Sequence, residues 1–495
     1  MSEIRNEFGR RDVLRAGVVV AAGAATAVGA MSTASASPAS APDRVTALTG
    51  VTVIDATGRP PQRNTTVLIR RERIIGMGHG VGIPAGTEVI AMPGKFVIPG
   101  LCDAHVHTMP MEQISPPLYL ATGITTVREM SGTPLLHQWR DRIERGELPG
   151  PRSMMASRII DGAPTTGDPA MFTEVATEQE AREAVRQAKR DGADFVKLVS
   201  RMPRDLHQVV ADESRRQRIP FTGHLPDAVP LTVASAAGQR SIEHLYATWY
   251  ETSTRENELY ARIAKLTFEH GDYPGWLRET HRLEWDAVNS YSARKAAAAF
   301  AALARNGTRV VPTLSVYQML DRPDDIDLTD QRLRYVPASA VEGWRWALEN
   351  IIMAGRTPEE IGQHRELLEH RLTFVRELAN AGVPVVAGTD GGDLPFVIPG
   401  YGLHDELALL VRAGLSPLAA LRAGTIEAMR LLGLDHALGT VESGKLADLV
   451  VLDADPLADI RNTTRIHAVV ARGRVITAEQ RTRMLDDIAI AAAQS

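Results

Sequence analysis

The sequence predicts an α/β protein in which a (β/α)8 TIM barrel is joined to a small β-sandwich domain. Two observations carry this prediction. Across residues 99–436, strand-like apolar runs alternate with amphipathic helical stretches, which is the rhythm of parallel βαβ units. Residues 42–98 instead hold short Val-, Ile- and Thr-rich runs separated by Gly, Pro and Asn, and this texture returns in residues 437–480. The similar texture favours one sheet built from both ends of the mature chain, with the barrel inserted between them.

Residues 1–41 resemble a twin-arginine signal peptide. Arg10 and Arg11 precede an uncharged run rich in Ala, Gly and Val, and small residues at 34–36 or 39–41 offer a cleavage site. A soluble helix and a membrane anchor are the alternatives, but the run is short for a membrane span. We therefore expect an exported protein, periplasmic or extracellular, with no stable membrane anchoring after signal cleavage.

Composition narrows the class of partner. Of the 495 residues, 44% are hydrophobic and 23% charged, which are ordinary globular values, and the formal net charge is -5. The sequence shows no basic stripe interleaved with aromatic residues, which a nucleic-acid groove would require. We therefore expect a small-molecule substrate and no nucleic-acid partner. The single cysteine, Cys102, excludes an internal disulfide.

The strand-like runs of the barrel end in residues that carry chemistry. In chain order they include "VIPGLCDAHVHT" (97–108), "GITTVREM" (123–130), "DFVKLVS" (194–200), "PFTGHL" (220–225), "QRSIEHL" (239–245) and "PVVAGTDGG" (384–392). Helical stretches such as 174–193 and 205–219 lie between them. Catalytic residues of such barrels lie at the C-terminal ends of the strands, so side chains at these ends should meet at one mouth.

Six candidate ligands satisfy this rule. His105 and His107 are two residues apart on a strand, and therefore point to the same face. The other four strand-end candidates are Lys197, His224, His244 and Asp390. Each alone has an ordinary explanation: a polar strand end, a lysine stem on apolar surface, a hydrogen-bonded core histidine, or a turn-capping aspartate. Six in order at one mouth predict a metal centre.

The order His-x-His, Lys, His, His, Asp resembles the amidohydrolase superfamily, of the type with a binuclear metal centre bridged by a carboxylated lysine. "VIPGLCDAHVHT" resembles its first strand, "AGTDGG" its last, and "LGTVESGKLADLVVLDADP" the return into its small β-sandwich. "GADFVKL", "SIEHL" and "LHDELALLVRAGLSP" resemble the branch of Xaa-Pro dipeptidases and imidazolonepropionase-like proteins. The resemblance implies a shared sandwich of residues 42–98 and 437–480, a barrel over 99–436 and a C-terminal tail over 481–495. It also permits a homo-oligomer.

The resemblance also implies a ligand set for two divalent metal ions, with zinc the expected identity. His105, His107 and Asp390 would hold the more buried ion. His224 and His244 would hold the more exposed ion, and a CO2-derived carbamate on Lys197 would bridge the two. A hydroxide between the ions would be the nucleophile, and Asp390 would act catalytically as general base and then general acid.

The expected function is metal-dependent hydrolysis of an amide (C–N) bond in a dipeptide or an N-acyl amino acid. The alternatives are hydrolysis of a cyclic amide, a lactone or a phosphotriester by the same hydroxide. A non-catalytic metal-binding protein on the same fold is an alternative of a different class.

Three further residues are candidates for substrate binding. Arg128 ends the second predicted strand and could bind a carboxylate, or pair with an acid in the protein. Tyr246 follows His244 and could polarise the carbonyl, while His404 follows the last strand and could overhang the metals or begin a helix. Residues 249–296 and 318–372 are longer than usual barrel connections, and form either lids or helical decoration.

Overall fold

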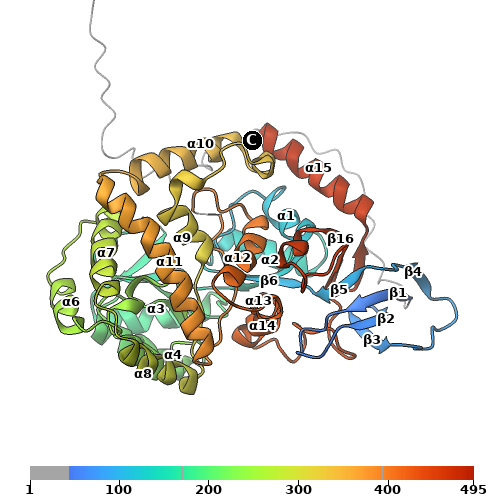
Figure 1. Ribbon diagram of the computed structural model, residues 1–495, viewed down its shortest axis with the longest axis horizontal. Coiled ribbons are helices and arrows are strands. Elements are labelled where there is room, and N and C mark those ends of the chain that lie inside the picture. The colour runs from blue at the N-terminus through green and yellow to red at the C-terminus, as the bar shows by residue number, and fades with distance from the viewer. Residues whose placement is uncertain (1–43, 169–170, 393) are drawn as a thin grey trace, which may run out of the picture.

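The computed structural model describes residues 44–168, 171–392 and 394–495, and it places a mixed sheet beside a helix-covered parallel region (Figure 1). The predicted α/β class with parallel sheets is confirmed. The predicted signal peptide, residues 1–41, lies outside the described residues. Among the helices of the described ranges, none combines the length and the apolar character that a membrane crossing requires.

Both ends of the described chain contribute to one eight-stranded sheet. Its strands are β1 (Val45–Val53), β2 (Gln62–Arg70), β3 (Arg73–Gly78), β4 (Glu88–Ala91), β5 (Phe96–Pro99), β15 (Leu449–Leu452), β16 (Ile466–Ala471) and β17 (Arg474–Ile476). Their order is β17-β16-β15-β5-β1-β2-β3, with β4 pairing β1. The two ends join where β5 and β15 pair antiparallel, with Val97 opposite Val451. The sheet shared by the two ends, which their similar residue pattern predicts, is therefore present. That this domain is a sandwich stays a prediction.

The middle of the chain forms two parallel sheets. One has the order β6-β7-β8, and the other has the order β10-β9-β11-β12-β13-β14. The strands are β6 (Leu101–Val106), β7 (Ile124–Glu129), β8 (Arg152–Met155), β9 (Ile159–Gly162), β10 (Phe172–Val175), β11 (Val196–Leu198), β12 (Phe221–His224), β13 (Ser241–Glu243) and β14 (Arg309–Val311). All residues of β6, β7, β11 and β13 are buried, as expected for parallel strands covered on both faces.

Single parallel bridges connect the ends of these sheets. Ala156 pairs with Phe195, Val310 with Val385, and Val106 with Gly391. The first bridge lies between β8 and β11, and the other two link the segment 385–391 to β14 and to β6. Closure of an eight-stranded barrel stays a prediction, and these bridges are its support.

Fifteen α-helices surround the sheets in the described residues. They are α1 (Ser115–Ala121), α2 (Pro134–Glu144), α3 (Glu178–Arg190), α4 (Arg204–Gln217), α5 (Leu231–Ala237), α6 (Glu256–Ile263), α7 (Tyr273–Val288), α8 (Ala293–Asn306), α9 (Leu314–Asp321), α10 (Ala338–Ala347), α11 (Pro358–Asn380), α12 (Tyr401–Arg412), α13 (Pro417–Ala423), α14 (Ile426–Leu432) and α15 (Ala478–Gln494). Helix α3 shows the local logic: Thr177 and Glu180 form a capping box at its start, and Ala181, Val185 and Ala188 form its buried stripe.

The two inserted segments are helical. Residues 249–296 contain α6 and α7, and α7 packs on the short helix η1 (Tyr246–Trp249) and on α11. Residues 318–372 contain α10, whose Trp344 lies in one apolar cluster with Met109 and Ile398. Because Met109 follows the His107 region and Ile398 follows the Asp390 region, this insertion covers the loops next to two predicted ligands.

The predicted C-terminal tail, residues 481–495, is mostly helical. Most of it belongs to helix α15, which packs on α1 and is seen at the upper right of Figure 1. Ile488 and Ala492 are buried in a cluster with Leu118 and Tyr335. The segment therefore has an apolar face with a partner on the barrel region, which its position after the last strand did not reveal.

Candidate metal centre

Three of the six predicted ligands, all histidines, surround the carboxylate of a fourth, Asp390, at the C-terminal ends of the parallel strands. Oδ1 of Asp390 lies 3.1 Å from Nε2 of His105 and 3.2 Å from Nε2 of His107. Its Oδ2 lies 3.7 Å from Nε2 of His244. These residues come from β6, from the turn that follows β13 and from the segment after Val385. The parallel arrangement thus brings together residues separated by up to 285 positions in the chain.

The other two predicted ligands border this group. Nζ of Lys197 on β11 lies 3.5 Å from Nε2 of His105. The rings of His224 and His244 have centroids 4.7 Å apart and meet edge to face. In the described part of the chain, the ligand atoms of His105, His107 and Asp390 all lie within 4.8 Å of one another, close enough to hold one ion. The structure therefore brings all six residues into one neighbourhood.

Each of the four histidines has a partner at Nδ1. His105 Nδ1 faces Glu243 at 3.0 Å, and His224 Nδ1 faces Ser200 at 2.7 Å. His107 Nδ1 lies 3.3 Å from the hydroxyl of Ser131, and His244 Nδ1 lies 2.7 Å from the hydroxyl of Thr313. A ring nitrogen held in this way directs the opposite nitrogen toward the centre, as metal-ligating histidines require.

The partners also define the tautomer of three rings. Glu243 is a carboxylate, so His105 must donate from Nδ1. The Ser131 hydroxyl donates to Glu129, and the Thr313 hydroxyl donates to the carbonyl of Pro312, so both hydroxyls are left to accept from their histidines. His105, His107 and His244 therefore carry the proton on Nδ1 and present the lone pair of Nε2 to the centre. This donor chemistry fits a divalent cation of the zinc type.

The backbone is strained at two candidate ligands. His244 and Asp390 have φ angles of 63° and 61°, a left-handed conformation that is uncommon for residues with a side chain. Thr313, which holds His244, has a φ of 48°. Such strain concentrates at functional sites, where the surrounding structure maintains it.

Burial determines the charge state of the bases in the centre. It lowers the pKa of Lys197 to about 8 and the pKa of His244 to about 3, because the charged form of each is poorly solvated. Burial also raises the pKa of Asp390, but its neighbours His105, His107 and His244 outweigh that effect, and the pKa lies well below its usual value. Asp390 is therefore a carboxylate, while burial favours the neutral form of His244.

Arg128 is placed differently from the prediction that it binds substrate. Arg128 is 2% exposed. Its three guanidinium nitrogens contact, in turn, the carbonyl of Ala104, the hydroxyl of Ser241 and the carboxylate of Glu243. A buried guanidinium whose three nitrogens each contact an internal acceptor is not available to clamp a substrate carboxylate. Arg128 is instead part of the interior that supports His105.

Of the two alternatives for His404, the structure shows the residue near the start of a helix and not a position above the metals. It is 3% exposed on α12, with Nδ1 at 2.9 Å from the hydroxyl of Thr463 and Nε2 at 3.0 Å from the carbonyl of Thr122. Both ring nitrogens are therefore used in packing α12 against neighbouring segments, and no ring nitrogen is left for a substrate.

Tyr246 lies where the sequence placed it. Its ring centroid is 5.2 Å from that of His244 and 5.9 Å from that of His224. On its other side it meets the edges of Trp276 and Tyr317 at 5.3 and 5.6 Å. This aromatic group connects the insertion that holds α7 to the ligands His224 and His244.

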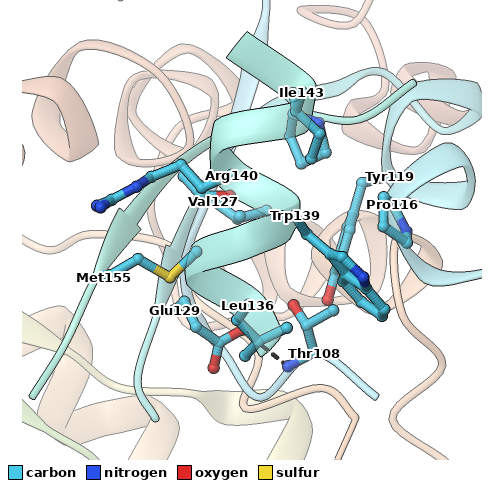
Figure 2. Close-up of a pocket in the computed structure, with 12 residues that line it drawn as sticks. Thr108, Pro116, Tyr119, Val127, Glu129, Leu136, Trp139, Arg140, Ile143 and Met155 are labelled. Atoms are coloured by element: carbon cyan, nitrogen blue, oxygen red, sulfur yellow. Dashed lines mark hydrogen bonds between the residues drawn. The ribbon is translucent and has the colours of Figure 1, made fainter. Parts of the chain in front are cut away.

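A small cavity lies behind His107. It has a volume of about 20 Å³ and lies beneath α2, lined among others by Thr108, Tyr119 and Glu129 (Figure 2). Glu129 accepts from the backbone of Thr108 at 2.9 Å, as the dashed line in Figure 2 shows, and from the backbone of Ser131 at 3.1 Å. This carboxylate therefore holds the loop that carries the partner of His107.

The sequence reasoning missed the partners of the histidines. Ser131, Ser200 and Thr313 follow strand ends, where polar residues are ordinary and give no distinctive signal. Glu243 had a usable signal, because it lies directly before His244 in a short strand whose residues are all buried, and a carboxylate in such a strand requires a donor.

Comparisons with known proteins concern the fold and the family of this chain. Among solved structures, a bottromycin amidohydrolase superposes with a TM-score of 0.71 at 23% identity over 91% of each chain. A putative prolidase from Bifidobacterium longum gives 0.62 at 24% identity, over 90% of this chain and 99% of the other. A Xaa-Pro dipeptidase with bound methionine gives 0.64 at 20% identity, over 88% of this chain and all of the other. At such identities the likeness concerns the fold.

Curated relatives match shorter stretches. Adenine deaminase 2 of Agrobacterium fabrum is 35% identical over 137 residues, which are 28% of this chain and 21% of that protein. Imidazolonepropionase of Geobacillus kaustophilus is 35% identical over 106 residues, which are 20% of this chain and 24% of that protein. The matches thus span less than a quarter of each relative. The model of the amidohydrolase family, by contrast, matches residues 96–476, and the chain belongs to this family.

Proposed function

We propose that this protein is a hydrolase that uses two divalent metal ions to cleave the amide bond of a dipeptide or an N-acyl amino acid. One observation carries the proposal: the carboxylate of Asp390 lies 3.1 to 3.7 Å from Nε2 of His105, His107 and His244. Three imidazole lone pairs directed at one buried carboxylate form a costly arrangement, and a bound cation would offset that cost. The proposed closed barrel, supported by the three parallel bridges, would hold this group at its mouth.

The six residues divide between two ion sites. We assign one ion to His105, His107 and Asp390, and the second to His224 and His244. Lys197 would bridge them as a carbamate formed with CO2. Carbamate formation requires the neutral amine, and burial favours that form by lowering the pKa of Lys197 to about 8. Zinc suits imidazole and carboxylate ligands at both positions.

When bound, the two ions would lower the pKa of a water nucleophile and polarise the scissile carbonyl. Asp390 accepts a proton at its carboxylate as the water oxygen bonds to the carbonyl carbon. It then delivers this proton to the leaving nitrogen as the C–N bond breaks, so the amine leaves neutral and the carboxylate is restored. His105 and His107, whose Nε2 atoms contact Oδ1, keep the carboxylate oriented for both transfers.

Tyr246 is assigned to the substrate. Its ring is fixed by Trp276 and Tyr317 beside His224 and His244, so its position does not depend on a bound ligand. A phenol hydroxyl at this place would donate to the carbonyl oxygen as negative charge develops there. The α10 insertion, whose Trp344 packs over the loops after His107 and Asp390, would exclude water from the reaction.

Cyclic amides form the second candidate class of substrate. The support is the 35% identity to an imidazolonepropionase, which extends over only 20% of this chain. A lactone or a phosphotriester would use the same residues, and a protein that binds metal without turnover is the non-catalytic alternative.

Export through the twin-arginine route is a separate proposal, supported by Arg10 and Arg11 before an uncharged run. Replacing both arginines by lysine should stop export of the full chain while leaving the protein folded in the cytoplasm. Equal amounts of the wild type and the variant outside the cytoplasm would contradict this route.

The proposed function is tested with a panel of Xaa-Pro dipeptides, N-acyl amino acids and cyclic amides, assayed with the zinc-loaded protein. Release of free amino acid by the wild type, lost in Asp390→Asn and retained in Asp453→Asn, is the expected result. Asp453 is a fair control because it forms a partly exposed ion pair with Lys95 in the terminal sheet. Turnover of the cyclic amides alone would move the assignment to the second class, and no turnover by a metal-loaded protein would favour the non-catalytic alternative.

A further inference from the structure

The interior of the parallel region contains a charged group that the proposed chemistry does not use. Glu243 on β13 is buried, and four donor groups surround its two carboxylate oxygens. Oε1 lies 2.8 Å from the hydroxyl of Thr222 and also contacts the hydroxyl of Ser241. Oε2 lies 2.5 Å from Nη2 of Arg128 and 3.0 Å from Nδ1 of His105. The carboxylate therefore joins β6, β7, β12 and β13 around one point beneath the metal centre.

Arg128 holds the carboxylate of Glu243 in place. Its Nε donates to the carbonyl of Ala104, the residue before His105, at 2.6 Å, and its Nη1 donates to Ser241 at 3.0 Å. The guanidinium is thus tied to the strand of His105 and to the strand of Glu243 at once. Glu243 therefore accepts from the guanidinium and from the imidazole of His105 through the same oxygen, Oε2.

His105 differs in this respect from the other histidines of the centre. Its Nδ1 faces a carboxylate, while His107, His224 and His244 face hydroxyl groups. A carboxylate behind an imidazole fixes the tautomer and makes the opposite nitrogen a stronger electron donor than a hydroxyl does. Because Nε2 of His105 also contacts both Asp390 and Lys197, its orientation affects the ligands of both proposed ions.

We propose that Glu243, clamped by Arg128, is the positioning residue that orients His105 and sets the affinity of the more buried metal ion. The inference rests on the proposed metal centre. It assigns to a buried arginine–glutamate pair a role in metal retention, beyond its contribution to folding. Loss of such a partner typically weakens metal binding 10- to 100-fold.

The test compares Glu243→Gln with Glu284→Gln. Glu284 is an apt control because it is also buried and also accepts from an arginine, Arg371, but has no hydrogen bond to a candidate ligand in the described part of the chain. A glutamine at 243 has one acceptor oxygen for donors that now use two, so the bond to His105 competes with the other three. Zinc affinities are measured by competition with a chromophoric chelator, and apo-protein unfolding midpoints are recorded for each variant.

We expect Glu243→Gln to bind one of two zinc ions 10- to 100-fold more weakly than the wild type, and Glu284→Gln to bind both within about threefold of it. The visible absorption of the cobalt-substituted protein should change in Glu243→Gln alone, because only there does a ligand change its orientation. Wild-type affinity in Glu243→Gln would overturn the inference. So would an equal loss in Glu284→Gln, because the loss would then follow destabilisation.

Two further results separate the inference from the proposal beneath it. If Glu243→Gln does not fold, Glu243→Asp carries the test, since it keeps the charge and withdraws the carboxylate from His105; unchanged zinc affinity in that variant would overturn the inference. A wild-type protein that retains no zinc would instead overturn the metal centre itself.

Discussion

Thr389 donates its hydroxyl to Oδ2 of Asp103 at 2.7 Å, and this bond ties the last parallel segment to the first strand. The backbone of Thr389 donates to Oδ1 of the same carboxylate at 3.0 Å, and the backbone of His105 does so at 3.2 Å. The candidate ligand His105 is one of the two residues that donate to Asp103, and the candidate ligand Asp390 directly follows the other, Thr389. Asp103 therefore sets the distance between two residues that lie far apart in the sequence.

Replacing Thr389 by valine keeps the shape of the side chain and removes this bond. We expect a loss of about 1–3 kcal/mol in the free energy of unfolding, since Asp103 keeps a buried oxygen without its hydroxyl donor. Metal affinity should fall at least tenfold, because His105 and Asp390 lose their fixed separation. Thr329→Val is the control, since Thr329 makes the same hydroxyl-to-carboxylate contact with Asp327 in an exposed turn. Equal zinc affinity in the two variants would contradict this role of Asp103.

Arg371 is the centre of a second buried ionic group. It donates to Asp321 at 2.9 Å and to both oxygens of Glu284 at 3.0 and 2.8 Å, and its guanidinium lies 3.8 Å from the ring centroid of Tyr317. Arg371→Met leaves two buried carboxylates without their cation, so we expect a loss of about 3–5 kcal/mol in unfolding free energy. Denaturant unfolding of apo-protein measures it.

The exposed arginine Arg412, which pairs with Glu369, supplies the control for that change. Arg412→Met should alter the unfolding free energy by less than about 1 kcal/mol, because exposed ion pairs contribute little. If both variants lost the same stability, the buried group around Arg371 would not be a special source of it.

Stability should fall at mildly acidic pH through His281. Its ring stacks on His364 with centroids 3.7 Å apart, and burial lowers its pKa to about 3, with the neighbouring charge of His364 in second place. The unfolded chain, with an ordinary pKa of about 6.5, therefore binds more protons than the folded chain between pH 6.5 and 3. The contribution of His281 to the free energy of unfolding is therefore fully present above pH 6.5. It decreases as the pH falls toward 3, by up to about 1.4 kcal/mol per pH unit.

His281→Phe keeps a stacked ring and removes the titration. The decrease in urea midpoint from pH 7 to pH 5 should be smaller in this variant than in the wild type, with both measured as apo-protein so that metal release does not contribute. His270→Phe, at an exposed histidine, should retain the wild-type decrease. A wild-type decrease in His281→Phe would assign the acid sensitivity to other groups.

Tyr246→Phe tests the residue assigned to the carbonyl. If the hydroxyl donates as charge develops on the substrate oxygen, kcat should fall about 10²- to 10³-fold with a smaller change in KM. Tyr260→Phe is matched to it, because the Tyr260 hydroxyl is buried without a partner in the described structure and lies on α6. Wild-type kcat in Tyr246→Phe would remove the residue from the chemistry.

The sequence predicted the parts of the centre that depend on strand position. His105, Lys197, His224 and Asp390 end apolar runs, and the rule that parallel strands end at one mouth was sufficient to group them. Arg128 satisfied the same rule, but the sequence left open whether it binds substrate or pairs with an acid in the protein. Its side chain enters the interior between strands, where Glu243 and Ser241 supply acceptors that no local pattern of residues 123–130 announces.

The packing of His404 and α15 could not be predicted from the sequence for a related reason. Whether His404 overhangs the centre depends on how α12 packs, and both of its ring nitrogens are used by Thr122 and Thr463 from distant segments. The apolar face of α15 is recognised as a packing face only once Leu118 and Tyr335 are known to lie against it. Long-range packing of this kind has no signature in the spacing of the residues themselves, whereas strand ends and caps do.

The measurement that tests the central claim most directly is the metal content of the purified mature protein by plasma mass spectrometry, for the wild type and Lys197→Ala in parallel. The account predicts about two ions per chain in the wild type and a sharp decrease in the variant, because the bridging ligand is gone. One ion per chain, unchanged by the substitution, would contradict a bridged pair and would remove Lys197 from the centre.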